Sequence, residues 1–202
     1  MFATLTLAEP PKIVVLGDSL SAGYGLPRAA GWVARLQLKL RDAGLPHRVV
    51  NASVSGDTTA GGLTRLPAVL ERERPRLVIV QLGANDGLRG FDLDLIEANL
   101  QALVALARAA GSDVLLVGNR LPPNYGAAYT QGFQDVFEGI ARREKVPLVP
   151  ALLEGVAERW ELMQPDGLHP TADAQPQLLQ NVWAVLGPML LPEMAGGSPS
   201  GD

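Results

Sequence analysis

A serine, a histidine and an aspartate are placed in this sequence where they could perform nucleophilic catalysis. Ser19 lies in segment 17–21, GDSLS, directly after an apolar run. A serine nucleophile needs a neighbouring base, and the chain has only two histidines, His47 and His169. His47 leads into a predicted strand at its amino end, away from the expected cleft, so we interpret it as structural. Asp166 stands three residues before His169, a spacing that could let its carboxylate hold one ring nitrogen while the other faces Ser19.

Two further segments offer hydrogen-bond donors for the oxyanion of such a reaction. Gly56 follows the second predicted strand, and a glycine N–H can approach a ligand without a side chain in the way. Asn85 follows the third strand and carries a side-chain amide that could donate to the same oxygen. Each also has a plainer interpretation. Gly56 could be a turn residue before a helix capped by Asp57 or Thr58, and residues 83–87 could form an ordinary turn.

The segment around Ser19 also has competing interpretations. It could be a strand-to-helix turn in which Asp18 or Ser19 caps the helix. It is not a nucleophile elbow of the G-x-S-x-G kind, because Ser21 replaces the second glycine. Phosphate or nucleotide binding is disfavoured because no Gly-Lys-Ser/Thr follows. Arg28 stands at the third glycine position of a dinucleotide fingerprint, and Asn51 ends the second strand where an acidic residue is expected.

The elements that must position these residues alternate between short apolar runs and longer helical patterns. This alternation is typical of a parallel sheet wrapped by helices. Most of the runs are continuously apolar, as expected for strands covered on both faces. Because ligands of such sheets bind beyond the carboxyl ends of the strands, the polar segments after each strand are the expected site. We predict strands at residues 12–17, 48–52, 77–82, 114–118 and 146–149.

Four longer segments have the spacing of amphipathic helices. In residues 30–43, four apolar side chains fall on one face, namely Trp32, Val33, Leu36 and Leu40. Residues 93–110 show a similar stripe, with Asp92 as the predicted N-cap and Gly111 as a stop signal. Two more helices are predicted, over about residues 130–144 and 172–186.

Composition excludes several classes of protein. The 202 residues contain no cysteine, which leaves neither a disulfide framework nor a thiolate metal site, and two histidines make a multi-histidine metal site implausible. The formal charge of −4 and the scattered basic residues do not favour nucleic acid as a partner. No apolar run approaches the roughly 18 residues of a membrane span. We expect one domain over residues 12–191, an N-terminal extension over 1–11 and a disordered tail over 192–202.

Taken together, the four segments resemble the conserved blocks of the SGNH, or GDSL, hydrolases. The resemblance extends over most of residues 12–190 and is greatest to bacterial thioesterase/protease/lysophospholipase enzymes and arylesterases. It rests on sequence stretches at residues 17–20, 50–53, 83–90, 120–126, 166–170 and 174–176. It implies a flavodoxin-like three-layer α/β/α fold with a five-stranded parallel sheet and a domain of the SGNH hydrolase type.

The resemblance also implies roles for individual residues. Ser19, Gly56, Asn85 and His169 would be the four family residues, and Asp166 would complete the triad. Substrate would be contacted by a mobile loop around residues 87–92 and by a leucine after the fourth strand; the residues concerned are Gly87, Leu88, Arg89, Gly90 and Leu121. Two departures, Ala84 and the pair Gly118-Asn119, could alter the shape of the pocket.

The expected function is therefore a serine esterase or thioesterase that hydrolyses aryl esters, acyl-CoA and lysophospholipids through an acyl-enzyme on Ser19. The oxyanion would be held by Ser19 N–H, Gly56 N–H and Asn85. We expect no cofactor, no metal and a monomer acting on small molecules. The resemblance suggests a periplasmic location, with the signal peptide absent or trimmed from this chain; the alternative is cytoplasmic. Rival functions are a carbohydrate O-acetylesterase of the same family and a non-catalytic flavodoxin-like module that binds phosphate.

Overall fold

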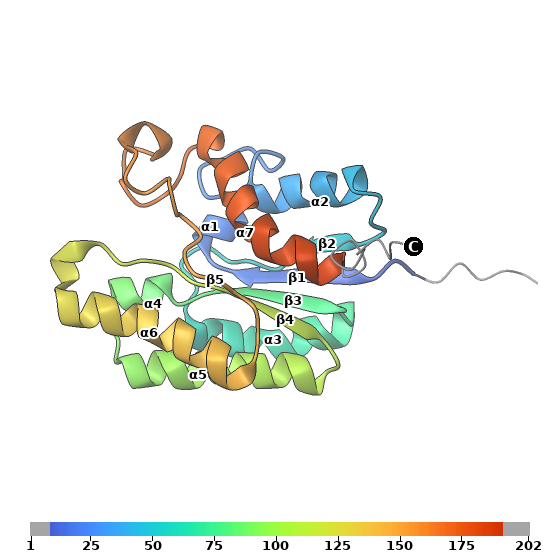
Figure 1. Cartoon of the computed structure of the whole chain (residues 1–202), viewed down its shortest axis with the longest axis horizontal. Coiled ribbons are helices and arrows are strands. Elements are labelled where there is room, and N and C mark those ends of the chain that lie inside the picture. Colours follow the sequence, from blue (N-terminus) through green and yellow to red (C-terminus); the bar gives the residue numbers. More distant parts are fainter. Residues whose placement is uncertain (1–8, 192–202) are drawn as a thin grey trace, which may run out of the picture.

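The protein is built around a five-stranded sheet with helices on both faces (Figure 1). The structure is a computed structural model, and it describes residues 9–191. The strand order is β2-β1-β3-β4-β5, and every pairing is parallel. The strands are β1 (Lys12–Gly17), β2 (Arg48–Asn51), β3 (Leu77–Gln81), β4 (Asp113–Val117) and β5 (Leu148–Val149). The flavodoxin-like three-layer α/β/α fold with five parallel strands is confirmed.

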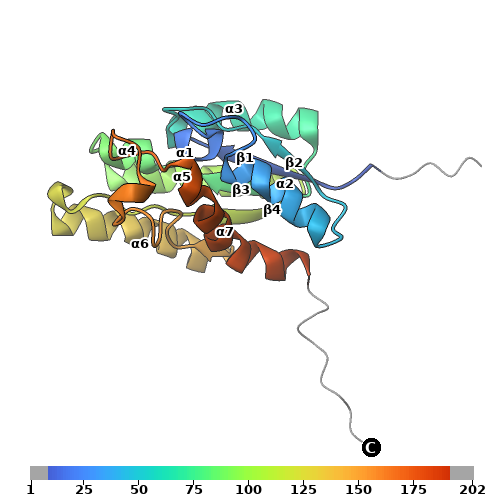
Figure 2. The same cartoon turned by 90° about the horizontal axis from the view of Figure 1, so that it is seen from above.

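The helices divide into two layers, which Figures 1 and 2 show from two directions. One face of the sheet is covered by α2 (Trp32–Asp42) and α7 (Gln175–Leu190), and the other by α3 (Thr59–Glu73), α5 (Leu93–Ala109) and α6 (Ala127–Glu144). Shorter helical turns lie in the connections. They are α1 (Ser19–Ala22), α4 (Ala84–Leu88), η1 (Pro123–Tyr125), η2 (Trp160–Leu162) and η3 (Ala172–Ala174).

Alternate side chains of each central strand enter opposite cores. Ile79 packs in the core beneath α2 and α7, whereas its neighbours Val78 and Val80 pack in the core beneath α3, α5 and α6. In β4, Leu115 and Leu116 divide in the same way. Because both faces are covered, no position of these strands needs a polar residue. This explains the continuous apolar runs that predict the strands.

The predicted elements hold with small shifts at their ends. The first predicted helix, α2, begins at Trp32 with Gly31 as its N-cap, and the predicted face of residues 32, 33, 36 and 40 is buried. Asp92 caps α5 as predicted, and Thr58 caps α3 through a hydrogen bond from the Gly61 N–H. The last predicted helix starts with a 3-10 turn and continues to Leu190. The fifth strand is two residues long instead of four.

The plainer interpretation of residues 83–87 as an ordinary turn is wrong. Gly83 has φ +110°, a conformation that suits glycine, and the chain then enters the short helix α4. Asp86 anchors this helix from below, since its carboxylate accepts hydrogen bonds from the Thr59 backbone N–H at 2.9 Å and hydroxyl at 2.6 Å. Asn85 therefore belongs to a helix that buried hydrogen bonds hold in place.

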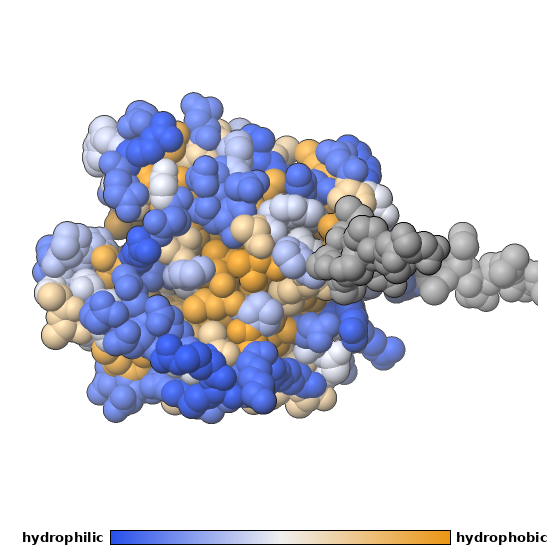
Figure 3. Space-filling model, viewed as in Figure 1, coloured by the Kyte–Doolittle hydropathy of each residue, from blue (hydrophilic) through white to orange (hydrophobic). Residues whose placement is uncertain are grey.

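Residues 1–8 of the predicted extension and the predicted disordered tail lie outside the described residues. Within residues 9–191, no helix is long and apolar enough to cross a membrane. On the face seen in Figure 3, hydrophobic residues gather most densely between α6 and α7, over β5 at the edge of the sheet.

Candidate active site

The predicted catalytic residues meet beyond the carboxyl ends of the strands. Ser19 follows β1, Asn85 follows β3, and these two strands are neighbours at the centre of the sheet. The chain leaves β1 toward β2 on one side, while β4 and β5 lie on the other, so the crevice is the switch point where such sheets bind ligands. Segment 163–170, which carries Asp166 and His169, closes over it, with Met163 and Pro170 paired in an antiparallel bridge.

Ser19, His169 and Asp166 form a continuous hydrogen-bonded chain. His169 Nε2 lies 2.9 Å from Ser19 Oγ, and His169 Nδ1 lies 2.7 Å from Asp166 Oδ2. Hydrogen bonds from the His169 side chain and backbone and from the Leu168 N–H lower the pKa of Asp166 to about 2. An ionised carboxylate at Nδ1 fixes the tautomer that carries its proton on that nitrogen. Nε2 is then free to accept the proton of Ser19.

The sharp turn into α1 presents Ser19 at the mouth of the sheet. Asp18 caps this helix by accepting a hydrogen bond from the Leu20 N–H at 3.0 Å, as one of the competing interpretations predicts. Gly17 is required beneath it, because a Cβ at that position would lie 2.8 Å from both Gln81 Oε1 and Ser21 Cβ. Asp18 thus caps the helix, and the adjacent Ser19 forms the hydrogen bond with His169.

A buried polar network lies beneath Ser19 and is not predicted from the sequence. Asp18 is 1% exposed, and its Oδ1 also accepts a hydrogen bond from Gln81 Nε2 at 3.1 Å. Gln81 Oε1 in turn accepts a hydrogen bond from Ser21 Oγ at 2.5 Å. Burial is the largest cause that raises the pKa of Asp18 to about 6. The one signal in the sequence is the lone polar residue that ends the strand LVIVQ.

Replacing Asp18 by asparagine is expected to stabilise the protein at pH 8. The pKa of this carboxyl rises from 3.8 to about 6 on folding, so the folded state binds the proton more tightly and wild-type stability falls as pH rises through that window. Each pKa unit corresponds to about 1.4 kcal/mol, so the substitution should raise the free energy of unfolding at pH 8 by up to about 3 kcal/mol. Urea denaturation at pH 4 and pH 8 measures it. A stability difference that is the same at both pH values would contradict the buried-charge argument.

The two other predicted oxyanion donors lie on neighbouring loops. The Asn85 amide donates one hydrogen bond to the Asp57 carbonyl oxygen at 2.9 Å, which orients the amide and leaves its second N–H for a ligand. Gly56 has φ +77° and is exposed, and its carbonyl oxygen accepts a hydrogen bond from Arg89 at 3.2 Å. Asp57 is itself held by an ion pair with Arg65. The loop that carries Gly56 is thereby tied to α3 and α4.

A cavity of about 450 Å³ opens beside Ser19 and His169. Its wall includes Ser19, His169 and Asn85, and the remainder is mainly apolar. The apolar lining residues are Leu20, Ala84, Leu88, Leu121, Pro122, Pro123, Leu153, Ala157, Met163 and Leu168. The site therefore combines a polar reaction centre with a hydrophobic chamber.

Only part of the predicted substrate-binding set reaches this cavity. Leu88 and Leu121 line it, but Gly87, Arg89 and Gly90 do not. Gly87 is buried behind the wall, where a Cβ would lie 2.8 Å from Leu121 and Phe133, and Gly90 is a positive-φ residue at the end of the helical turn. Sequence neighbours separate in this way because α4 directs successive side chains to different sides.

The segment after α4 is fastened by two tyrosines. The Tyr125 hydroxyl donates to the Leu88 carbonyl oxygen at 2.7 Å, and the Tyr129 hydroxyl donates to the Phe91 carbonyl oxygen at 2.6 Å. Tyr24, which the sequence does not place at the site, packs its ring 4.4 Å from that of His169. Its place was not visible in the sequence because it lies 145 positions before the histidine.

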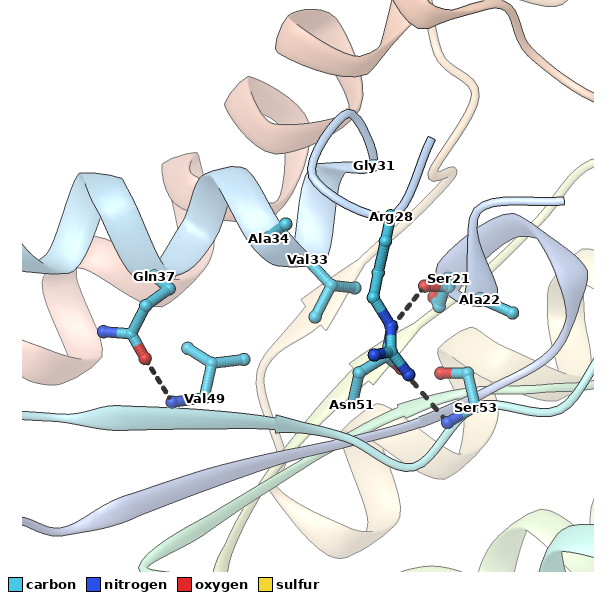
Figure 4. A pocket seen from close by; sticks show the side chains of 10 residues that line it. All are labelled: Ser21, Ala22, Arg28, Gly31, Val33, Ala34, Gln37, Val49, Asn51 and Ser53. Atoms are coloured by element: carbon cyan, nitrogen blue, oxygen red, sulfur yellow. Dashed lines mark hydrogen bonds between the residues drawn. The ribbon is translucent and has the colours of Figure 1, made fainter. Parts of the chain in front are cut away.

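A second cavity of about 300 Å³ lies between α2 and the end of β2 (Figure 4). Arg28 and Asn51, the residues that count against a nucleotide fingerprint, both line it. Asn51 donates to the Ser21 carbonyl oxygen at 2.8 Å, and Gln37 Oε1 accepts from the Val49 N–H at 2.8 Å. These amides join α1, α2 and β2 to one another. None of the predicted triad lines this cavity.

The remaining histidine is remote from the site, as predicted. His47 precedes β2 at the amino end of the sheet, and burial lowers its pKa. Within residues 9–191, no group of three or more histidine, aspartate or glutamate side chains is arranged to hold a metal ion.

Comparison with known proteins agrees with this geometry. A family model for the GDSL-like lipase/acylhydrolase family matches residues 15–175. Esterase TesA of Pseudomonas aeruginosa is 53% identical over 183 residues, or 91% of each chain. Thioesterase 1/protease 1/lysophospholipase L1 of Escherichia coli is 44% identical over 86% of this chain and 82% of its own.

Solved structures give the same result. A crystal structure of TesA superposes with a TM-score of 0.87 at 52% identity, covering 89% of this chain and 99% of that one. The esterase EstA from Pseudoalteromonas, in a structure inhibited by monoethylphosphonate, superposes with a TM-score of 0.85 at 40% identity over 89% and 98% of the two chains. The family model, the identities and the fold together show that this chain belongs to the GDSL-like lipase/acylhydrolase family.

Proposed function

We propose that this protein hydrolyses carboxylic esters and acyl thioesters through an acyl-enzyme on Ser19. The observation that carries the proposal is the hydrogen-bonded chain from Asp166 through His169 to Ser19, at 2.7 and 2.9 Å, at the wall of an apolar cavity. Relatives named esterase, arylesterase and thioesterase/lysophospholipase support the same class of substrate.

The reaction proceeds by two acyl transfers. His169 Nε2 takes the proton of Ser19 as Oγ attacks the acyl carbonyl carbon, and the oxygen becomes negative while the N–H groups of Ser19 and Gly56 and the Asn85 amide donate to it. His169 then gives its proton to the departing alcohol or thiol. In the second half, His169 deprotonates a water that attacks the acyl-enzyme, and Ser19 recovers its proton as the acid leaves.

The apolar wall favours acyl groups longer than acetyl. Leu88 and Leu121 would contact the chain close to the reaction centre, and Leu153 and Met163 line the same cavity. Each buried methylene contributes about 0.8 kcal/mol, so affinity should grow with chain length until the cavity is filled. A purely polar acetylated carbohydrate would leave most of this surface uncovered.

A panel of p-nitrophenyl esters and acyl-CoA thioesters of increasing length tests the proposal. We expect kcat/KM to rise from acetyl toward medium chains, and a fluorophosphonate probe to label Ser19, as identified by peptide mass spectrometry. A steep fall from acetyl to octanoyl would favour the carbohydrate O-acetylesterase. Absence of both labelling and turnover would favour a non-catalytic phosphate-binding module.

Replacing Asn85 by alanine is expected to lower kcat by about 10²–10³, with little change in KM, because the lost donor acts mainly on the charge that develops in the transition state. Steady-state kinetics on p-nitrophenyl butyrate measure the effect. Asn181→Ala is the matched control, since this asparagine also donates to backbone carbonyl oxygens, those of Leu152 and Glu154, but does not line the cavity. Equal turnover in the two variants would remove Asn85 from the oxyanion site.

We further propose that the protein is a monomer, and the family resemblance supports a periplasmic location. Light scattering should give the mass of a single chain. Fractionation of cells that express the native gene should place the activity in the periplasmic extract, and a dimer mass or a cytoplasmic activity would each refute the corresponding part.

A further inference from the structure

Three large side chains stand exposed around the mouth of the catalytic cavity. They are Trp160, Tyr24 and Leu168, which are 70%, 53% and 47% exposed, and we call them the apolar rim. Trp160 belongs to η2, on the excursion between β5 and α7 that projects from the body of the molecule (Figure 1). Large exposed apolar groups gathered at one place indicate a surface that contacts something other than water.

The rim is continuous with the cavity. Leu168 belongs both to the rim and to the cavity wall, and the Tyr24 ring packs against His169. The Trp160 indole lies against Gly167, where a Cβ would be 3.6 Å from it. Gln164 binds the Tyr24 carbonyl oxygen at 2.9 Å and so joins the two segments. Leu168 therefore connects the rim directly to the mainly apolar cavity wall that contains Ser19.

The charges beside the rim lean acidic. Arg120 pairs with Glu154 at 2.8 Å and Arg159 with Glu161 at 3.0 Å. Glu158 also stands at the cavity mouth, and within residues 9–191 no cation pairs with it. The excess negative charge opposes an anionic lipid surface but suits a zwitterionic one, whose ammonium groups lie outermost.

We propose that the apolar rim docks the protein onto aggregated zwitterionic phospholipid or lysophospholipid and delivers acyl chains from that surface to Ser19. Tryptophan and tyrosine prefer the boundary between water and lipid, where the ring is covered and the polar atom stays hydrated. An exposed indole can also face a headgroup ammonium. The inference rests on the proposed esterase function for its consequence in catalysis, but the docking itself does not require turnover.

Binding is measured first, with vesicles of ether-linked phosphatidylcholine, which contain no acyl ester. We expect the wild-type protein to co-sediment with them, with a blue shift in tryptophan fluorescence that Trp160→Ala abolishes. Trp32 is fully buried and Trp183 partly so, which leaves Trp160 as the exposed reporter. Partition of Trp160→Ala should be about tenfold weaker, as expected from losing burial of one large apolar side chain. Phosphatidylglycerol vesicles should bind less protein than phosphatidylcholine vesicles.

Two variants keep the test specific. Leu38→Ala removes another exposed hydrophobic side chain, 47% exposed on α2 and away from the cavity, and should bind vesicles as the wild type does. Trp160→Phe retains an apolar ring and should recover most of the binding. If Trp160→Ala and wild type partition equally, or if neither binds, the proposal is overturned. A wild-type dimer that Trp160→Ala dissociates would instead identify the rim as a contact between two copies.

Kinetics separate the docking from the esterase itself. Trp160 does not line the cavity, so Trp160→Ala should hydrolyse monomeric p-nitrophenyl butyrate at the wild-type rate. Its rate on lysophosphatidylcholine should lose the increase that the wild type gains above the aggregation concentration of that lipid. A wild type inactive on p-nitrophenyl butyrate would refute the proposed function and leave the vesicle result to judge the docking.

Discussion

The Ser19→Ala protein is expected to fold normally and to lose turnover by about 10⁴-fold or more, because no oxygen nucleophile remains at the hydrogen-bonding position of His169. The Ser19 hydroxyl lies 2.9 Å from His169 Nε2, whereas the helix cap of this turn is provided by the neighbouring Asp18. The hydroxyl is therefore not needed for the turn. Initial rates on p-nitrophenyl butyrate measure the loss, and the thermal midpoint reports on the fold.

The matched control lies two residues further along the chain. Ser21 is buried and its hydroxyl donates to Gln81, so Ser21→Ala should lose stability, on the order of 1 kcal/mol for a buried hydrogen bond, while it keeps most of its turnover. Ser19→Ala is thus expected to lose activity and keep its stability, whereas Ser21→Ala is expected to lose stability and keep most of its activity. Turnover in Ser19→Ala close to that of the wild type would exclude Ser19 as the nucleophile.

Asp166→Asn is expected to lower kcat by about 10³–10⁴, the second largest effect, because the amide would face His169 Nδ1 with a donor. The ring would then carry its proton on Nε2, which can no longer accept the proton of Ser19. The backbone N–H groups of Leu168 and His169, each 3.0 Å from Asp166 Oδ1, can still find the amide oxygen, so the loop should persist. Kinetics at pH 7–8 measure the effect.

Asp173→Asn is the control, since Asp173 is an exposed aspartate in η3 that does not line the cavity. It should retain wild-type kinetics. The pKa of Asp166 is lowered from 3.8 to about 2, so its contribution to stability is present above pH 3.8 and is lost as pH falls toward 2. Any fall in rate on acidification above pH 4 is therefore expected to come from a group other than Asp166. Full activity of Asp166→Asn would remove this residue from the triad.

The sequence predicts the nucleophile, base and orienting acid because each is limited by residue type and local spacing. His169 is one of only two histidines, and Asp166 lies three residues away from it, within reach inside a single loop. Ser19 and Asn85 follow predicted strands, and parallel strands bring their carboxyl ends to one edge. Residue type and periodicity were therefore enough to predict a parallel α/β sheet and the residues of the proposed site, while the three-layer arrangement was implied by the family resemblance and the strand order came from the structure.

Contacts across the fold are harder to infer. The link between Asp18 and Gln81 spans 63 positions, and nothing near either residue indicates the other. The substrate segment shows the same limit at short range, since Leu88 lines the cavity while its neighbours Gly87 and Arg89 do not. The short helix α4 turns these side chains to different sides, whereas the glycine-rich sequence alone suggests a turn.

The sequence by itself thus determined a parallel α/β sheet and a serine, histidine and aspartate suited to acyl transfer, because these depend on hydrophobic periodicity and local chemistry. Only the tertiary structure decided which side chains form the cavity wall, that Asp18 is buried with a raised pKa, and that Trp160 stands exposed beside the cavity mouth. The physical reason is that burial, and with it pKa and exposure, is set by chain segments that pack together from distant positions.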